Sequence, residues 1–328
     1  MSICVVGDPH FKKTNQKETD ILVEDCIKLV KYKKPEFTVI LGDVYDEGEY
    51  IHHTCIKRVN NFILRLRDLC HVYILVGNHD RPNNRVYLTD DHPFELFSYL
   101  SNVTIVYRCH TFEWRNKKIC MMPYVPNGMF HQACNDCNIN ITDYDLFFCH
   151  QEFKHCSTNL ITKSDCDEWL SYYPFCVAGH IHKKQTIGNN LIYPGTPYQV
   201  KFDEDTDKGI YIMNENFEFE QFETRIPPKI NLKINYNEID ILLSLDENSQ
   251  YKITIEGPRE EIKQILQRKE YKEKLSNLTI QYKDTTKVKK AKSEVLLNTP
   301  FEERLKILLQ NDRKRELFEE ATRFSVRL

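Results

Sequence analysis

Five short stretches of the sequence carry side chains that are suited to binding divalent cations. The stretches are GDPH (residues 7–10), GDVYD (42–46), GNHD (77–80), HQE (150–152) and GHIH (179–182). Their candidate metal ligands are Asp8, His10, Asp43, Asn78, His150, His180 and His182. Carboxylate and amide oxygens and imidazole nitrogens are common ligands of first-row divalent metals and of magnesium. A set of this size predicts a site for two cations.

Each of these stretches follows an apolar run that is typical of a buried strand. The runs are SICVVG, FTVILG, VYILVG, DLFFCH and FCVAGH. Ligands at the carboxyl ends of neighbouring strands converge on one crevice of an α/β sheet. The alternative is a set of unrelated turns, since Gly, Asn and Asp are turn formers. Ligand-type residues at the end of every run argue against that alternative.

The order and wording of these motifs resemble the calcineurin-like metallophosphoesterase superfamily over about the first two thirds of the chain. The HQE stretch and the run GHIHKKQTIGNNLIYPGTPYQ (179–199) are similar to the SbcD-type nuclease subunit of double-strand-break repair complexes, including phage and viral relatives. A protein phosphatase of the superfamily would carry arginine after the second aspartate motif and GNHE, whereas this chain has Glu47 and Asp80. The resemblance implies a four-layer α/β/β/α sandwich with a small α+β cap domain and a helical carboxyl-terminal tail.

The resemblance also implies a role for each ligand. One metal would be held by Asp8, His10 and His182 and the other by Asn78, His150 and His180, with Asp43 bridging them. Manganese is expected, with magnesium, iron or zinc as alternatives. His79 would donate a proton to the leaving oxygen, and Asp46 would orient His79. A purely structural role is the alternative for both.

The composition predicts a globular intracellular protein. The 328 residues are 41% hydrophobic, with no run of 18 apolar residues and no amino-terminal secretory signal. We therefore expect no membrane association. The 12 cysteines are expected to be free thiols, and Cys134 and Cys137 lack the second pair of a zinc site. The net charge of −3 neither favours nor excludes nucleic acid. The candidate basic patches are Lys12 and Lys13, Arg81 and Arg85, and KVKKAK (287–292), and the alternative for each is a solvated charged face.

Hydrophobic periodicity predicts the remaining elements. Helices are expected over residues 20–33 and 56–70, with a short helix near 94–100. Alternating segments between 185 and 222 are expected to form hairpins on the end of the second sheet. The prolines of IPPK (226–229) separate domain 1–225 from a β-β-α-β cap domain over 226–284. Residues 285–328 are expected to form a linker and an amphipathic helical tail.

The resemblance further implies three partners. The cap would contact DNA, and the helices after GNHD would form a homodimer. The tail would bind an SMC-like ATPase of the SbcC type. The predicted function is a metal-dependent DNA nuclease that processes DNA ends in double-strand-break repair and recombination. The alternatives are a phosphoesterase acting on a small substrate such as a cyclic nucleotide, and a scaffold with a vestigial site.

Overall fold

The computed structural model describes residues 1–156, 165–246, 248–268, 270–271 and 279–284. The chain divides into two compact units, Met1–Lys229 and a second unit that begins at Ile230. This division lies just after the predicted boundary at 225/226. Residues 285–328, where the linker and tail are predicted, lie outside the described part. Among the described helices, none is both long and apolar enough to cross a bilayer.

The first unit contains two six-stranded sheets. The first sheet has the strand order β12-β11-β1-β2-β3-β4. Its strands are β1 (Ser2–Val6), β2 (Phe37–Ile40), β3 (His71–Leu75), β4 (Val103–Val106), β11 (Ile210–Asn214) and β12 (Phe219–Phe222). Strands β1 to β4 are parallel, as the predicted β-α-β units require. The carboxyl ends of β1, β2 and β3 therefore meet at one edge.

The second sheet has the strand order β5-β6-β7-β8-β10-β9. Its strands are β5 (His110–Trp114), β6 (Lys117–Met122), β7 (Leu146–His150), β8 (Phe175–Gly179), β9 (Gln185–Ile187) and β10 (Leu191–Tyr193). Strands β6, β7 and β8 are parallel, and His150 lies opposite Gly179. The prediction that all segments between 185 and 222 extend this sheet is correct for β9 and β10. It is wrong for β11 and β12, because β11 pairs antiparallel with the free edge of β1.

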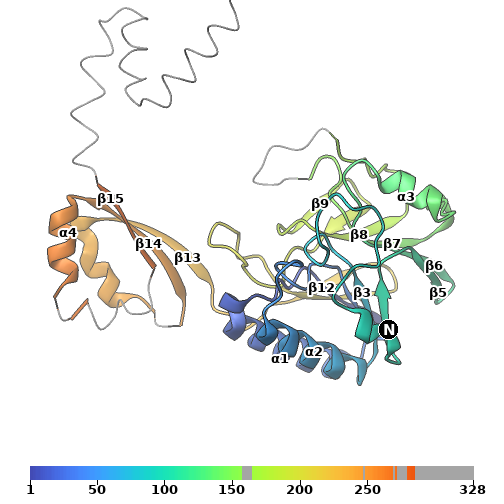
Figure 1. Ribbon diagram of the computed structural model, residues 1–328, viewed down its shortest axis with the longest axis horizontal. Coiled ribbons are helices and arrows are strands. Elements are labelled where there is room, and N and C mark those ends of the chain that lie inside the picture. Colours follow the sequence, from blue (N-terminus) through green and yellow to red (C-terminus); the bar gives the residue numbers. More distant parts are fainter. Residues whose placement is uncertain (157–164, 247, 269, 272–278, 285–328) are drawn as a thin grey trace, which may run out of the picture. The chain divides into compact units, whose positions relative to one another are not determined.

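Helices cover the outer faces of both sheets, which gives the predicted α/β/β/α layers. They are α1 (Gln16–Lys33), α2 (His53–Arg67) and α3 (Phe130–Asp136). Figure 1 shows α1 and α2 along one side of the unit and α3 on the other. Three apolar clusters fill the three spaces between layers, with Leu22 and Phe62 under the first pair of helices, Val39 and Phe148 between the sheets, and Phe130 under α3. The sandwich fold is thus confirmed.

Helix α1 begins and ends at recognisable signals. Leu22, Cys26 and Leu29 form its buried stripe, as the periodicity predicts. The helix starts before the predicted position because its first turn, which includes the buried Glu18, is polar. It ends at Lys33, and the next residue, Lys34, adopts the left-handed conformation with φ of 49° and donates its N–H to the Val30 carbonyl.

The second unit contains a three-stranded sheet with the order β13-β14-β15. Its elements are β13 (Lys229–Asn235), the 3₁₀ helix η4 (Tyr236–Ser244), β14 (Gln250–Gly257), α4 (Arg259–Leu266) and β15 (Thr279–Asp284). Alternate residues of β14 are buried and pack with Ile262 of α4 in a separate core. The strand and helix order agrees with the predicted β-β-α-β arrangement, with η4 as an addition.

Candidate metal centre

All seven predicted metal ligands lie together at the carboxyl ends of the strands. Three of the ligand-bearing loops follow β1, β2 and β3 of the first sheet, and the other ligands come from the end of β7 and the turn after β8 in the second sheet. The side chains form two groups, and within each group the ligand atoms lie within 4.8 Å of one another. The first group is Asp8, His10 and His182, and the second is Asp43, His150 and His180. Asn78 adds an amide oxygen to the second group, since its Oδ1 lies 3.0 Å from His150 Nε2 and 2.7 Å from His180 Nδ1.

Asp43 lies between the two groups. Its Oδ2 is 3.8 Å from His10 Nε2, and its Oδ1 is 3.3 Å from His150 Nε2. The side chain is buried, so the carboxylate is fixed between both histidines. This position is the one expected of a carboxylate shared by two cations.

The hydrogen-bond pattern of the first group fits a bound cation. His182 Nδ1 lies 2.8 Å from Glu204 Oε1. Because a carboxylate oxygen accepts and does not donate, Nδ1 carries the ring proton, and Nε2 of the neutral ring presents a lone pair. That lone pair faces His10 Nε2 at 2.9 Å. In the same group, the buried Oδ1 of Asp8 has no hydrogen-bond partner. A cation would be stabilised by all three residues.

The second group follows the same pattern. His150 Nδ1 donates to the Leu41 carbonyl at 2.7 Å, which leaves Nε2, 3.0 Å from Asn78 Oδ1 and 3.3 Å from Asp43 Oδ1, as the nitrogen that would bind a cation. Burial by itself lowers the pKa of His150, but the Asp43 and Asp8 carboxylates raise it to about 10. The surroundings therefore favour positive charge at this position, which a divalent cation would supply.

The backbone around the ligands explains the glycines in the motifs. A Cβ atom on Gly42 would lie 2.4 Å from His150 Nδ1, and one on Gly77 would lie 2.2 Å from Asp43 Oδ1. Side chains at these positions would displace two ligands. Three of the predicted ligands also have left-handed backbone, with φ of 45° at His10, 47° at Asp43 and 81° at His180. Such conformations are uncommon outside glycine and cluster at functional sites.

His79 is exposed beside the first group, with its ring centroid 5.0 Å from that of His10. Its Nδ1 donates to the backbone carbonyl of Asp46 at 2.5 Å. The Asp46 carboxylate lies elsewhere, 3.2 Å from His10 Nδ1 and 3.4 Å from Lys12 Nζ. The contact to His10 has an ion-pair distance but not the alignment of a hydrogen bond, since His10 Nδ1 has no hydrogen-bond partner. Asp46 therefore contacts His79 through its backbone and not, as predicted, through its carboxylate.

Two acidic residues of the site did not figure among the predicted functional residues. Buried Asp80 accepts hydrogen bonds from the backbone N–H groups of Tyr45, Val44 and Gly77, at 2.9, 3.2 and 3.0 Å. It thereby connects the GDVYD loop to the GNHD loop. Its position within the GNHD motif was the sequence feature from which a role at the site could have been predicted. Glu204 contacts His182 from a stretch, KFDEDTDKG, in which no spacing distinguishes one acid from the next.

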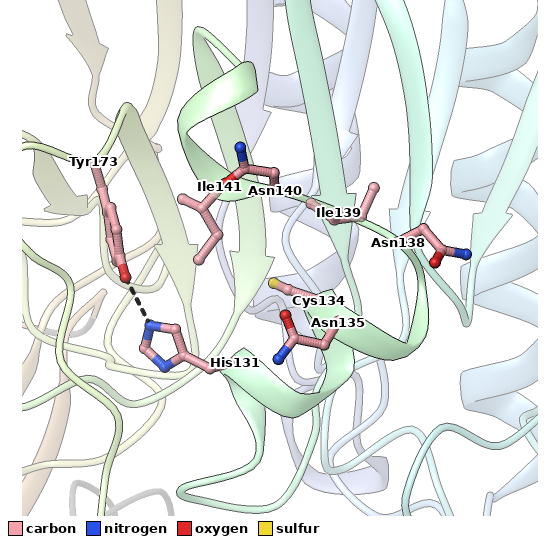
Figure 2. Close-up of a pocket in the computed structure, with 8 residues that line it drawn as sticks. All are labelled: His131, Cys134, Asn135, Asn138, Ile139, Asn140, Ile141 and Tyr173. Carbon is pink, nitrogen blue, oxygen red and sulfur yellow. Dashed lines mark hydrogen bonds between the residues drawn. The ribbon is translucent and has the colours of Figure 1, made fainter.

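Away from these ligands, a cavity of about 450 Å³ lies at the opposite end of β7 and β8 from His150 and His180 (Figure 2). His131 and Tyr173 meet in its wall, with 3.2 Å between Nε2 and the hydroxyl. Cys134 also lines it.

Among the residues with described positions, the two groups above are the metal-ligating clusters, and all 12 cysteines are free. The prediction of free thiols is confirmed.

Comparison with known proteins agrees with this centre. Residues 1–188 match the family model of the calcineurin-like phosphoesterases, a range that includes all seven predicted ligands. The chain is 32% identical over 272 residues to "Putative phosphoesterase 078R" of Invertebrate iridescent virus 3, covering 80% of this chain and 78% of that protein. It is 32% identical over 276 residues to "Putative phosphoesterase 244L" of Invertebrate iridescent virus 6, covering 80% and 95%.

Among solved structures, the chain is similar to Chaetomium thermophilum Vps29, with 11% identity, 67% of this chain and 92% of that chain covered, and a TM-score of 0.26. The family match covers more than half of the chain, and the viral relatives are matched over most of their length. Hydrolysis of phosphate esters with divalent cations is therefore the activity of this chain, which belongs to the calcineurin-like phosphoesterase family.

Proposed function

We propose that this phosphoesterase is a DNA nuclease that hydrolyses phosphodiester bonds at DNA ends. The observation that carries the proposal is the position of His79, which is exposed beside the two ligand groups. A phosphodiester in DNA has an alkoxide leaving group, and cleavage is helped by a proton donor at that oxygen. This role is supported by the exposure of His79 at a rim where His180 and His182 are also partly exposed.

The residues of the centre divide the work. Asp8, His10 and His182 would hold one cation and Asn78, His150 and His180 the other, with Asp43 shared. When bound, two divalent cations lower the pKa of water and offset the negative charge of the phosphate. Oxygen and nitrogen ligands together suit manganese, and they also accept magnesium, iron or zinc.

His79 would transfer its proton from Nε2. Its Nδ1 keeps a proton because it donates to the Asp46 carbonyl, which only accepts. The protonated ring therefore has one N–H free to donate, at Nε2, and transfer leaves a neutral ring that still donates to Asp46. The His79 backbone N–H is held by Asp43 Oδ1 at 2.8 Å, which fixes the donor relative to the shared carboxylate.

A cavity beside the centre supports a nucleic-acid substrate. It measures about 310 Å³, and Asp46, Lys12, Lys13 and Tyr50 are among the residues that line it. The charges of Lys12 and Lys13 are matched by the Asp46 and Glu47 carboxylates in the same lining, and Lys12 pairs with Asp46 at 3.4 Å. The feature of the cavity that supports a nucleic acid is the Tyr50 ring, which is 77% exposed and available to stack on a base. The cavity thus suits the nucleotide next to the scissile phosphate. It would also accept a cyclic nucleotide, which makes a small phosphodiester the second candidate substrate.

The test is degradation of end-labelled linear duplex DNA by the purified protein with Mn²⁺, Mg²⁺ or a chelator, with Asn78→Ala as the inactive control. We expect manganese-dependent trimming that the variant lacks. Hydrolysis of bis-p-nitrophenyl phosphate is measured in parallel, together with a cyclic nucleotide. Intact DNA alongside hydrolysis of either small diester would contradict the nuclease proposal while leaving the metal centre in place.

Three partners complete the proposal. The second unit contacts DNA, a role suggested by the resemblance of the chain to SbcD-type nucleases, which carry a cap of this β-β-α-β kind. The 3₁₀ helix η2 (Glu95–Tyr99) forms a homodimer contact, which is supported by the exposure of Leu96 (79%) and Tyr99 (77%). Residues 285–328, outside the described part, bind an SMC-like ATPase. Removal of residues 301–328 should leave manganese-dependent cutting intact and abolish stimulation by that ATPase and ATP.

A further inference from the structure

We infer that Glu204 is a positioning residue for the metal centre, acting through His182. Glu204 Oε1 accepts a hydrogen bond from His182 Nδ1 at 2.8 Å. This contact keeps the ring proton on Nδ1 and directs the Nε2 lone pair towards His10, 2.9 Å away. The inference rests on the two-metal part of the proposed function and is independent of the substrate.

Glu204 is itself held in place. Its side chain is 8% exposed, and its second oxygen, Oε2, accepts from the Val200 backbone N–H at 2.9 Å. The same oxygen lies 3.5 Å from Thr196 Oγ1 and 3.5 Å from Lys208 Nζ. A carboxylate with donors on both oxygens has little freedom to rotate, so it can impose an orientation on the partly exposed His182 ring.

Lys208 forms a second link between Glu204 and His182. Its ammonium group donates to the His182 backbone carbonyl at 2.6 Å while it faces Glu204 Oε2. The ring and the backbone of His182 are thus both held by this buried ion pair. A carboxylate on the second nitrogen of a ligating histidine fixes its tautomer and raises its basicity, and its loss costs about 10- to 100-fold in metal affinity.

Glu204 could instead serve only to neutralise Lys208. Asp205 provides the matched control. Its carboxylate also faces Lys208, with 3.7 Å between Oδ1 and Nζ, and its side chain is 38% exposed. Glu204→Gln removes the carboxylate beside His182 and keeps the side-chain shape. Asp205→Asn removes a carboxylate beside the same lysine and leaves His182 untouched.

The experiment is a titration of the metal-free full-length protein with Mn²⁺ alone, followed by calorimetry. We expect Glu204→Gln to weaken one of two Mn²⁺ sites by about 10- to 100-fold, and Asp205→Asn to bind like the wild type. Equal weakening in both variants, or no weakening in either, would overturn the inference. Because no substrate is present, this result does not depend on whether the protein cuts DNA.

A second readout is the tautomer of His182 in the wild-type protein, which tests the inference even where Glu204→Gln does not fold. Long-range ¹H–¹⁵N spectra of the metal-free protein report the tautomer of each histidine. The His182 ring signals are identified as those that are missing from the spectrum of His182→Gln. We expect a proton on Nδ1 of His182, and a shift towards Nε2 in Glu204→Gln. A wild-type His182 protonated only on Nε2 would refute the positioning role directly.

Discussion

Asp43 Oδ1 accepts a hydrogen bond from the backbone N–H of His79 at 2.8 Å. One carboxylate therefore contacts both ligand groups and also fixes the residue that is proposed to protonate the leaving oxygen. Movement of Asp43 would disturb metal binding and proton transfer together. Movement of the His79 ring alone would disturb only proton transfer, which allows the two functions to be separated by substitution.

His79→Ala should slow DNA cleavage by about 10²- to 10⁴-fold, the usual contribution of a general acid. Hydrolysis of bis-p-nitrophenyl phosphate should fall much less, since nitrophenolate leaves without a proton. Both rates are measured at saturating Mn²⁺, and Mn²⁺ stoichiometry should remain at two. His53→Ala, at an exposed position on α2, is the control. An equal loss on both substrates would remove acid catalysis by His79 from the mechanism.

Metal removal should lower stability, because a cation that binds only the folded chain stabilises it by mass action. At a Mn²⁺ concentration about 100 times the dissociation constant, one site adds about 2.7 kcal/mol. Asp43→Asn removes the charge shared by both groups and should abolish most of this gain. Urea unfolding with Mn²⁺ and with chelator measures it, and Asp90→Asn, at an exposed position, should behave as wild type. An unchanged response of Asp43→Asn to Mn²⁺ would contradict a shared carboxylate.

The ligands could be predicted from the sequence because each follows a buried apolar run directly. A strand end next to Asp8 or Asn78 is a local signal, and parallel pairing of β1, β2 and β3 then places the ends together. The sheet assignment of β11 could not be predicted. Its alternation indicates a strand, but its partner β1 lies at the other end of the unit in sequence.

The residues that contact the ligands from behind could also not be predicted from the sequence. Glu204 is separated from His182 by 22 residues, and its neighbours include several acids of similar spacing. Only tertiary packing selects one of them. The contact between His79 and Asp46 was predicted through the Asp46 carboxylate, whereas His79 Nδ1 donates to the Asp46 backbone carbonyl. The sequence does not say which atom of a residue faces a neighbouring loop.

Asp80→Asn should destabilise the fold and reduce activity together. The Asp80 carboxylate accepts three backbone N–H groups, and the amide would present a donor to at least one of them. An unsatisfied buried donor costs about 1–3 kcal/mol. Urea unfolding in chelator measures the loss, with Asp68→Asn, whose side chain is 72% exposed, as the control. Wild-type stability of Asp80→Asn would show that the two loops are held by other contacts.

The proposed homodimer can be tested at η2. Leu96→Glu together with Tyr99→Glu places two charges on an exposed apolar surface, and desolvating them in an interface would be costly. We expect the double variant to sediment as a monomer and the wild type as a dimer. Tyr32→Glu, at a residue of α1 that is 79% exposed, should leave the dimer intact. A wild-type monomer at micromolar concentration would exclude this contact.

The Asp167 carboxylate should make stability depend on pH. Burial raises its pKa, but hydrogen bonds from His131 Nδ1 (2.8 Å) and the Phe130 backbone N–H (2.9 Å) lower it below the usual value. A folded-state pKa below the unfolded value means that the charged form stabilises the fold above about pH 4, and that this contribution is lost as the pH falls through the folded-state pKa.

Asp167→Asn should therefore unfold more easily than the wild type at pH 7, by about 1–2 kcal/mol, and the difference should shrink at pH 3. Urea unfolding of both proteins in chelator between pH 3 and pH 7 measures it. The carboxylate also lies at the start of α3, where a negative charge interacts favourably with the helix dipole. A difference that stays constant over the whole range would mean that the Asp167 side chain acts through its shape and not through its charge.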